Sequence, residues 1–335
     1  MRRYVFDRFG LDNLRIADEP PPEPSRGEVL VSVKALSLNY RDLVVIEGRY
    51  NPRLPLPATP ISDAAGIVVE TGPGVDPSAR GMAVMTHFLP GWRDGPFRAE
   101  YRRSSLGAPG PGLAAETVVL PAEAVTAAPR GLDLAEAATL PVASLTAWNA
   151  LFVEGDVGRD RTVLTLGTGG VSVFALQLAK AAGARVIITS GSDAKLARAR
   201  DLGADGGINY TQRPDWDSAV LELTGGDGVD LVVETGGIGT LERSLRAVRA
   251  GGVVALCGSL TGLEGKINIA RAIMNRVRIA GFLVGSLASF QELTQFVEAH
   301  GIRPVVDRRF PFDCLEQALR HLAAGLHFGK VVVEV

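Results

Sequence analysis

The pattern of hydrophobic and polar positions changes character about halfway along the chain. Near the N-terminus, residues 28–35 place Val29, Val31 and Val33 at every second position, which is typical of a half-buried β-strand. Residues 66–84 contain short apolar segments separated by glycines, and this predicts short strands joined by turns. The first third of the chain is therefore predicted to be β-rich.

From about residue 160, continuous apolar runs alternate with helical patterns. The predicted strands cover 161–167, 184–190, 229–237, 251–259 and 278–286, and the predicted helices cover 171–183, 194–204 and 240–252. Buried strands separated by helices predict βαβ units, and hence an α/β domain with a doubly wound parallel sheet.

The tail contains two further helical stretches, at 288–301 and 313–325, and ends in a strand at 330–335. We expect this tail to return to the N-terminal region. The predicted domains are 1–127, completed by 287–335, and 128–286. The segment 86–112 is rich in glycine and proline and predicts a long surface loop, in which Trp92 either lines a substrate pocket or anchors the loop.

Composition narrows the function classes. The 335 residues are 46% hydrophobic and 21% charged, with a formal net charge of −2, which gives no reason to expect nucleic acid or an anionic membrane as a partner. The first residues lack the apolar core of a signal peptide, and no apolar run is long enough to span a bilayer. With only two cysteines, Cys257 and Cys314, we expect a cytoplasmic protein without a disulfide framework.

A glycine-rich loop lies between the strand at 161–167 and the helix that follows it. In its sequence GTGGVS, Gly167 permits a tight turn and Gly169 allows the backbone to approach a pyrophosphate, which the helix N-terminus attracts. Ser172 stands where a third glycine is usual, and it is small enough for close packing. This context predicts dinucleotide binding by Gly167, Thr168, Gly169, Gly170 and Val171.

The choice between NAD and NADP depends on the end of the second strand. An NAD enzyme usually has Asp or Glu there to bind the ribose 2′-hydroxyl, whereas this chain has Ser190. Ser190, Ser192 and Lys195 can bind a 2′-phosphate, so the sequence favours NADP(H). The alternative is that Ser192 caps a helix and Lys195 is a solvated side chain.

Three segments carry a family resemblance: EVLVSVKALSLNYRD (28–42), SDAAGIVVETGPGV (62–75) and GTGGVSVFALQLAKAAGARVI (167–187). They resemble the medium-chain dehydrogenase/reductase superfamily, which includes the zinc-type alcohol dehydrogenase-like proteins, and in particular its zinc-independent, quinone-oxidoreductase-like branch. The resemblance implies a GroES-like catalytic domain, a Rossmann domain and a cofactor in the cleft between them. It also implies a homodimer joined through the strand that begins at residue 278.

The resemblance also shows which metal ligands are missing. The family's catalytic zinc positions correspond to Asn39, to Ser62 followed by Asp63, and to Val142. Zinc prefers Cys, His or carboxylate ligands, and the 86–112 segment has no cysteine for a structural zinc. The sequence therefore predicts no metal.

Without zinc, reduction of a quinone or enone is less demanding than reduction of a simple ketone, because conjugation spreads the developing negative charge onto an oxygen that needs only hydrogen-bond donors. Asn39 is the candidate donor, Tyr40 a candidate donor or proton source, and Asp42 a residue that orients its neighbours. The alternative is that Asn39 caps a helix and Asp42 is a first-turn carboxylate.

The resemblance implies further cofactor contacts outside the glycine loop. Each of these residues can instead be purely structural, as a buried hydroxyl, an interface aromatic or part of a glycine turn. The contacts that the resemblance implies are Thr146, Tyr210, Phe282 and Val284. Three more are expected because they end parallel strands, where ligands gather in doubly wound sheets: Gly236, Gly258 and Ser259.

Two other functions remain open. One is an NADP-dependent alcohol dehydrogenase or carbonyl reductase that works without metal, and the other is a non-catalytic protein that retains nucleotide binding. The small-molecule substrate itself is not identified by the sequence.

Replacing Ser190 tests the assignment of the cofactor. Because a carboxylate repels a 2′-phosphate, Ser190→Asp should weaken NADPH binding and shift the preference toward NADH. The measurement is kcat/KM with each cofactor, and an unchanged preference would remove the argument from Ser190.

Overall fold

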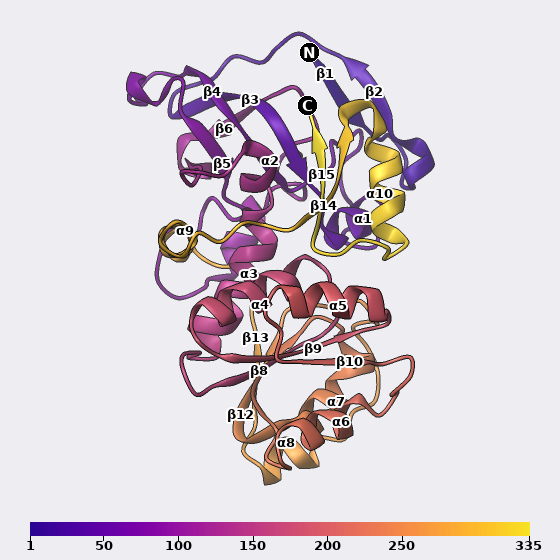
Figure 1. Cartoon of the computed structure of the whole chain (residues 1–335). Helices are drawn as coiled ribbons and strands as arrows, with labels where there is room; N and C mark the ends of the chain where they lie inside the picture. The colour runs from indigo at the N-terminus through magenta and orange to yellow at the C-terminus, as the bar shows by residue number, and fades with distance from the viewer. The chain divides into compact units, whose positions relative to one another are not determined.

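The computed structural model describes all 335 residues, which form two compact units (Figure 1). The first, called the β-rich unit below, contains Met1–Leu145 and Gly285–Val335. The second, called the α/β unit, contains Thr146–Val284. The chain thus leaves the β-rich unit once and returns to it. None of its helices has the length and apolar composition needed to cross a membrane.

The first boundary differs from the expected one after residue 127. Residues 128–145 remain with the β-rich unit because helix α2 (Leu134–Ala137) packs on strands β3, β4 and β5 of its sheet. The second boundary falls at residue 285 rather than 287.

The β-rich unit contains nine strands and four α-helices, together with short 3₁₀ and π turns. Its strands are β1 (Arg2–Val5), β2 (Arg15–Asp18), β3 (Glu28–Ser37), β4 (Asp63–Thr71), β5 (Ala83–Thr86), β6 (Thr117–Pro121), β7 (Val125–Ala127), β14 (Val306–Pro311) and β15 (Lys330–Glu334). Its helices, besides α2, are α1 (Tyr40–Ile46), α9 (Leu287–His300) and α10 (Leu315–Ala323).

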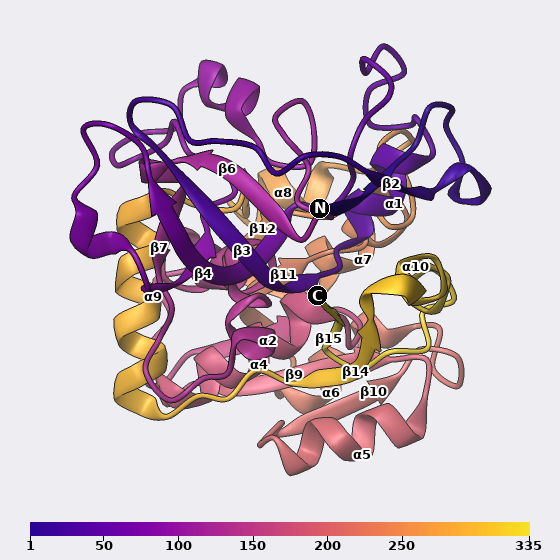
Figure 2. The same ribbon diagram turned by 90° about the horizontal axis from the view of Figure 1, so that it is seen from above.

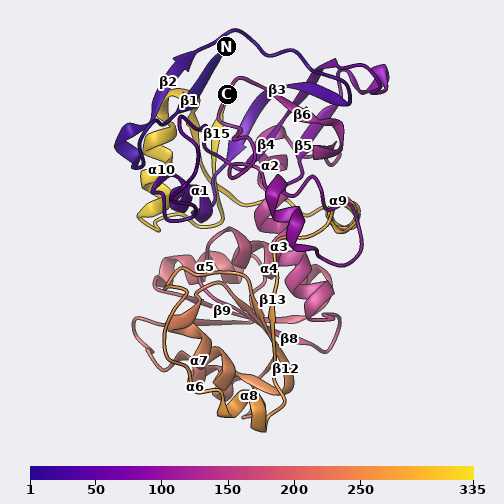
Figure 3. The same ribbon diagram turned by 180° about the vertical axis from the view of Figure 1, so that it is seen from behind.

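Strand β3 is the centre of the main sheet. The strand order is β14-β15-β3-β4-β5-β7, and β6 pairs with the first half of β3. Val29, Val31 and Val33 are all buried, as their alternation predicts. Strand β15 pairs antiparallel with the end of β3, so the last strand of the chain lies beside the segment that leads into α1. Helix α10 packs against β14 and β15 (Figures 2 and 3).

The α/β unit has a six-stranded sheet with the order β10-β9-β8-β11-β12-β13, in which every pair is parallel. Helices α4 and α5 cover one face, and α6, α7 and α8 lie on the other (Figures 1 and 3). The strands are β8 (Thr162–Thr165), β9 (Arg185–Ser190), β10 (Gly206–Asn209), β11 (Val229–Glu234), β12 (Val248–Leu256) and β13 (Arg278–Gly281). The helices are α4 (Gly170–Ala181), α5 (Asp193–Asp201), α6 (Trp216–Leu223), α7 (Ile238–Ala247) and α8 (Ala270–Met274). A helical segment of π and α turns, which includes α3 (Leu145–Trp148), links the two units.

The predicted fold class is confirmed, and several elements need correction. The helix expected over 240–252 ends at Ala247, because Val248 is buried and starts β12 beside Val229 of β11. The strand expected over 278–286 ends at Gly281. The sequence pattern did not predict β10 or α6, and the 86–112 segment contains a 3₁₀ helix over Ala99–Ser104. In this sheet the strand order reverses between β8 and β11, which is where ligands bind in doubly wound folds.

Candidate functional site

The glycine loop after β8 has the backbone that dinucleotide binding requires. Gly167 has φ +74°, a conformation that favours glycine, and its N–H donates to Thr189 Oγ1 at 3.0 Å. Helix α4 begins at Gly170, so the free N–H groups of its first turn adjoin the loop. These residues fit the pyrophosphate of a nicotinamide dinucleotide.

Ser172, which departs from the glycine motif, has a defined partner. Its side chain is buried, and its hydroxyl donates to the carbonyl oxygen of Leu166 at 2.6 Å. The hydroxyl therefore satisfies a carbonyl at the end of β8, to which a glycine could offer no side-chain donor.

The residues proposed to bind the 2′-phosphate lie at the end of β9. Ser190 is buried, and its Oγ accepts the N–H of Ser192 at 3.3 Å. Tyr210 donates its backbone N–H to the Ser190 carbonyl at 3.0 Å, and its ring lies against Gly191, where an added Cβ would be 3.0 Å from Tyr210 Oη. Ser190, Ser192 and Tyr210 are thus brought together.

The alternative that Ser192 caps a helix is also confirmed. Ser192 Oγ accepts the backbone N–H of Lys195 at 3.4 Å, so Ser192 caps α5. The carboxylate in this turn, Asp193, accepts hydrogen bonds from Asn209 at 2.8 Å and Gln212 at 2.7 Å. A carboxylate at the end of β9 itself is absent, since Ser190 occupies that position.

Glu234, at the end of β11, was not predicted as a functional residue. Its carboxylate is fully buried, and Oε1 accepts the N–H of Gly236 at 2.7 Å, the N–H of Gly237 at 3.1 Å and the hydroxyl of Thr240 at 2.7 Å. Oε2 accepts the hydroxyl of Ser244. The sequence signal that could have indicated a structural role for Glu234 is a carboxylate followed closely by two glycines at the end of a predicted strand.

Glu234 also contributes its main chain to the neighbouring turn. Its carbonyl accepts the N–H groups of Cys257 at 3.0 Å and Gly258 at 3.2 Å. An added Cβ at Gly258 would lie 2.1 Å from the Thr235 carbonyl oxygen, so only glycine fits there. One residue therefore holds the turns that follow β11 and β12.

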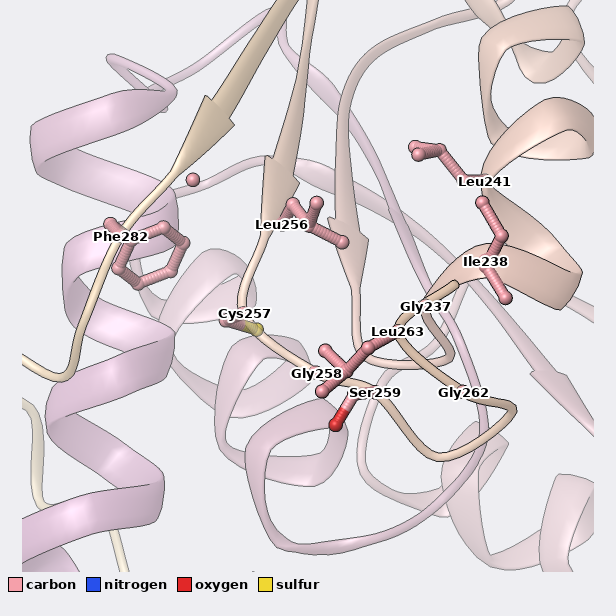
Figure 4. A pocket seen from close by; sticks show the side chains of 11 residues that line it. Gly237, Ile238, Leu241, Leu256, Cys257, Gly258, Ser259, Gly262, Leu263 and Phe282 are labelled. Carbon is pink, nitrogen blue, oxygen red and sulfur yellow. The ribbon is translucent and has the colours of Figure 1, made fainter. Parts of the chain in front are cut away.

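A pocket of about 300 Å³ opens beside these two turns (Figure 4). Ile238 and Leu241 of α7 line one side, and Phe282, which follows β13, lines another. The complete lining is Gly237, Ile238, Leu241, Leu256, Cys257, Gly258, Ser259, Gly262, Leu263, Gly281 and Phe282. Of the predicted cofactor contacts, Gly258, Ser259 and Phe282 meet here. Gly236 and Val284 are not part of the lining.

The surroundings of the thiol in this pocket disfavour its thiolate form. Burial, together with the charge of Glu234, raises the pKa of Cys257 to about 12, so the thiol stays protonated.

A second group of polar side chains is buried in the β-rich unit, around Asn39. Asn39 Nδ2 donates to Asp63 Oδ2 at 2.8 Å, and Asn39 Oδ1 accepts from Lys330 Nζ at 2.6 Å. Lys330 Nζ also donates to the Leu38 carbonyl at 2.7 Å. Neither Asp63 nor Lys330 was predicted as a functional residue. No local pattern could connect Lys330 with Asn39, because 291 residues separate them.

Asp42, Ser62 and Arg41 continue this polar group. Asp42 Oδ2 accepts the Asn39 backbone N–H at 2.8 Å, and Asp42 Oδ1 accepts the Ser62 hydroxyl at 2.6 Å. The Arg41 guanidinium donates to Ser62 Oγ and to the carbonyls of Leu106 at 3.0 Å and Ala108 at 3.1 Å. Asp42 is buried and positions the start of α1.

The ionisable groups of this cluster are shifted by burial. Burial raises the pKa of Asp63 to about 7, against the opposing effects of Lys330 and of the Asn39 hydrogen bond. It also raises the pKa of Asp42 and lowers that of Lys330. Asp63 Oδ1 is buried and accepts no hydrogen bond, so one carboxylate oxygen of the cluster is unpaired.

The remaining candidate residues, Tyr40, Trp92 and Thr146, are not members of this polar cluster. Tyr40 is the first residue of α1, and 38% of its surface is exposed. Trp92 donates its indole N–H to the Gly95 carbonyl at 2.9 Å and stacks on Tyr101 at a centroid distance of 6.1 Å. These contacts support the interpretation that Trp92 anchors its loop. Thr146 is buried in α3.

Comparison with known proteins agrees with this architecture. Residues 25–130 match the family model of the alcohol dehydrogenase GroES-like domain, and residues 170–299 match that of the zinc-binding dehydrogenases. A zinc-type alcohol dehydrogenase-like protein of Schizosaccharomyces pombe is 42% identical over all of this chain and 99% of its own. The chain belongs to the medium-chain dehydrogenase/reductase superfamily.

Relatives within the superfamily are named for different activities. An NADPH-dependent alkenal/one oxidoreductase of Arabidopsis thaliana is 30% identical over 99% of this chain and 79% of its own. The crystal structure of an NAD-dependent alcohol dehydrogenase is 36% identical over both complete chains, with a TM-score of 0.91. That of the quinone oxidoreductase from Coxiella burnetii is 28% identical over 100% of this chain and 99% of its own, with a TM-score of 0.83. This chain is accordingly an oxidoreductase of a superfamily that binds nicotinamide cofactors.

The superfamily's zinc does not fit the residues found here. Of the three ligand positions, Val142 has no side-chain donor atom, and the Ser62 hydroxyl is already bonded to Arg41 and Asp42. The third, Asn39, has its amide oxygen 2.6 Å from the Lys330 nitrogen, whose charge would repel a divalent cation. No group of three or more His, Cys, Asp or Glu side chains in the chain is arranged to hold a metal ion.

Replacing Glu234 should loosen both turns beside the pocket. A glutamine keeps the shape but replaces one of the two accepting oxygens with an NH2 group and removes the negative charge from the bonds to the other, so we expect Glu234→Gln to lower the free energy of unfolding by about 2–3 kcal/mol. The measurement is urea unfolding. Glu222→Gln is the matched control in the same unit, because Glu222 is exposed and pairs with Arg213, so its loss should cost about 0–1 kcal/mol. Equal effects of the two substitutions would contradict the role of Glu234.

Proposed function

We propose that this medium-chain oxidoreductase reduces quinones or enones with NADPH and without a zinc ion. The observation that carries the proposal is the side chain at the first zinc position. Asn39 presents a buried amide, held by Asp63 and Lys330, at the position that the resemblance assigns to a metal ligand of the family. An amide can donate hydrogen bonds to a developing oxyanion but cannot replace a thiolate as a zinc ligand. The names of the Arabidopsis and Coxiella relatives agree with this substrate class.

Three residues of the chain have separate roles in such a reduction. The bound nicotinamide supplies the hydride. The resemblance implies that Asn39 lies beside it, where the Nδ2 hydrogen not used by Asp63 can be donated to the substrate oxygen as negative charge develops there. Tyr40, which is partly exposed at the start of α1, can provide the proton. Asp42 orients Asn39 by accepting its backbone N–H.

The preference for NADP(H) is supported by the end of β9. Ser190 stands in place of the carboxylate that binds a free ribose 2′-hydroxyl, and Ser192 and Tyr210 adjoin it. We include Lys195 in the proposed 2′-phosphate site because it lies in the first turn of the helix that Ser192 caps.

We also propose a homodimer in which β13 pairs with its copy. Strand β13 forms one edge of the α/β sheet, so one row of its backbone groups is unpaired within the chain. Large apolar side chains are exposed on and near it, including Ile279, Leu283, Ile273 and Met274.

The two free cysteines favour a reducing compartment such as the cytoplasm.

A second candidate is an NADP-dependent alcohol dehydrogenase or carbonyl reductase. The names of the fission-yeast relative and of the 36% identical structure favour the alcohol dehydrogenase activity, and the second of these names specifies NAD rather than NADP. It differs from the first in predicting alcohol-dependent reduction of NADP at high pH.

The test of the proposal is NADPH oxidation by the purified protein with quinones, enones, aldehydes and ketones, and with NADH in parallel. We expect turnover of quinones or enones that a chelator leaves unchanged, with no stoichiometric zinc by metal analysis. Turnover confined to alcohols and simple ketones would favour the second candidate. Loss of activity on chelation, restored by zinc, would refute the metal-free mechanism, and NADPH binding without turnover would favour a non-catalytic role.

Replacing Asn39 tests its role as donor. Asn39→Ala should lower kcat by about a hundredfold, the usual effect of removing one oxyanion donor, with little change in NADPH affinity. The measurements are steady-state kinetics and NADPH titration by fluorescence. The matched control is Asn51→Ala in the loop after α1, where the amide oxygen accepts the N–H of its near neighbour Arg53. Equal turnover of the Asn39 variant and the native protein would exclude the donor role.

A further inference from the structure

We infer that Lys330 is the positioning residue that determines which end of the Asn39 amide is presented to the substrate. The inference rests on the proposed function in one respect, since it takes Asn39 as the donor to the substrate oxygen. No motif in the sequence singles out Lys330, and only its place in the fold brings it to Asn39.

The register of the sheet places the two residues opposite each other. Strand β15 pairs antiparallel with β3, with Val332 opposite Ser37, and the Leu38 N–H donates to the Val331 carbonyl at 3.0 Å. Continuing that register by one residue sets Lys330 beside Asn39. The Leu38 carbonyl then accepts from Lys330 Nζ at 2.7 Å and anchors the ammonium from the backbone.

An asparagine amide can be turned by about 180° without changing its shape, and its neighbours decide its orientation. An ammonium group has only donors, so the atom 2.6 Å from Lys330 Nζ must be the amide oxygen. The amide nitrogen then faces Asp63 Oδ2 at 2.8 Å. Both contacts favour the same orientation, and the Lys330 contact does so independently of the protonation state of Asp63.

The charges of the cluster support this arrangement. Two carboxylates, Asp42 and Asp63, and two cations, Arg41 and Lys330, are gathered in one largely buried region. Arg41 is occupied by Ser62 and by the carbonyls of Leu106 and Ala108. Lys330 is therefore the cation that holds the amide.

The amide orientation makes the site selective for a substrate atom that accepts a hydrogen bond. With its oxygen turned toward Lys330, Asn39 has one N–H that Asp63 does not use, so the site favours a substrate atom that accepts a hydrogen bond, such as a quinone or enone oxygen. In the reversed orientation the oxygen would meet the substrate oxygen and repel it.

The experiment compares Lys330→Met with the double variant Lys330→Met/Asp63→Asn. The single variant leaves the buried Asp63 without its countercharge, which can destabilise the fold and lower activity for that reason alone. The double variant removes both charges, so any loss of activity caused by destabilisation should be smaller in it. In neither is the amide oxygen held by an ammonium. Without Lys330 the charge that lowers the pKa of Asp63 is lost, so the buried carboxyl becomes protonated and can donate as well as accept, and it no longer sets the orientation. We expect kcat to fall about tenfold or more in both, with the KM for NADPH within about twofold of the native value.

Lys34→Met is the matched control, because Lys34 is an exposed lysine on β3 of the same sheet. It should leave kcat unchanged. Native kcat in the folded double variant would overturn the inference.

A second readout does not depend on turnover. The protein is labelled with ¹⁵N in its asparagine side chains, and the signal missing from the Asn39→Ala spectrum is that of Asn39. In the native protein we expect one protected amide signal, and in both Lys330 variants a shifted signal with faster hydrogen exchange. An unchanged signal would overturn the inference. If the signal moves as expected but the native protein reduces no quinone or enone, the proposed function fails and the positioning role of Lys330 stands.

Discussion

A lysine ammonium can be buried only where acceptors and countercharge surround it, and Lys330 has both inside the β-rich unit. Its nitrogen is held by the Leu38 carbonyl and the Asn39 amide oxygen, and the carboxylates of Asp63 and Asp42 balance its charge. Because Asn39 is also bonded to Asp63 and Asp42, the side chains of the cluster form one hydrogen-bonded network. The last strand of the chain, the end of β3 and the start of α1 are thereby fixed to one another.

In the proposed metal-free mechanism, hydrogen-bond donors take the place of a metal ion. In a zinc enzyme a divalent cation is the electrophile, and protein ligands neutralise it. Here the corresponding positions hold an amide, a hydroxyl and an apolar side chain, and the positive charge nearby belongs to lysine and arginine side chains. Hydrogen-bond donors suit an oxygen whose charge is already delocalised, which is the physical basis for proposing a conjugated substrate.

The α/β unit relies on a buried charge in a comparable way. Glu234 receives two backbone N–H groups and two hydroxyls, and its carbonyl receives two more N–H groups from the turn after β12. Satisfying so many donors with one residue leaves the two turns little freedom. The pocket in Figure 4 owes its shape to these turns together with α7 and the segment after β13.

The fold class, the glycine loop and the absence of a carboxylate at Ser190 can all be predicted from the sequence, because each depends on residues that are close in the chain. Apolar periodicity identified β3, β8, β9 and α4. The position of Gly167 between a strand and a helix predicted a dinucleotide-binding turn there. The short elements, the element boundaries and the buried polar cluster depend on contacts between distant parts of the chain. Short elements such as β10 and α6 lack a sustained period, and the end of α7 is set by the pairing of Val248 with β11. Lys330 meets Asn39 only because antiparallel pairing of β15 with β3 brings distant parts of the chain together, and no local pattern carries that register.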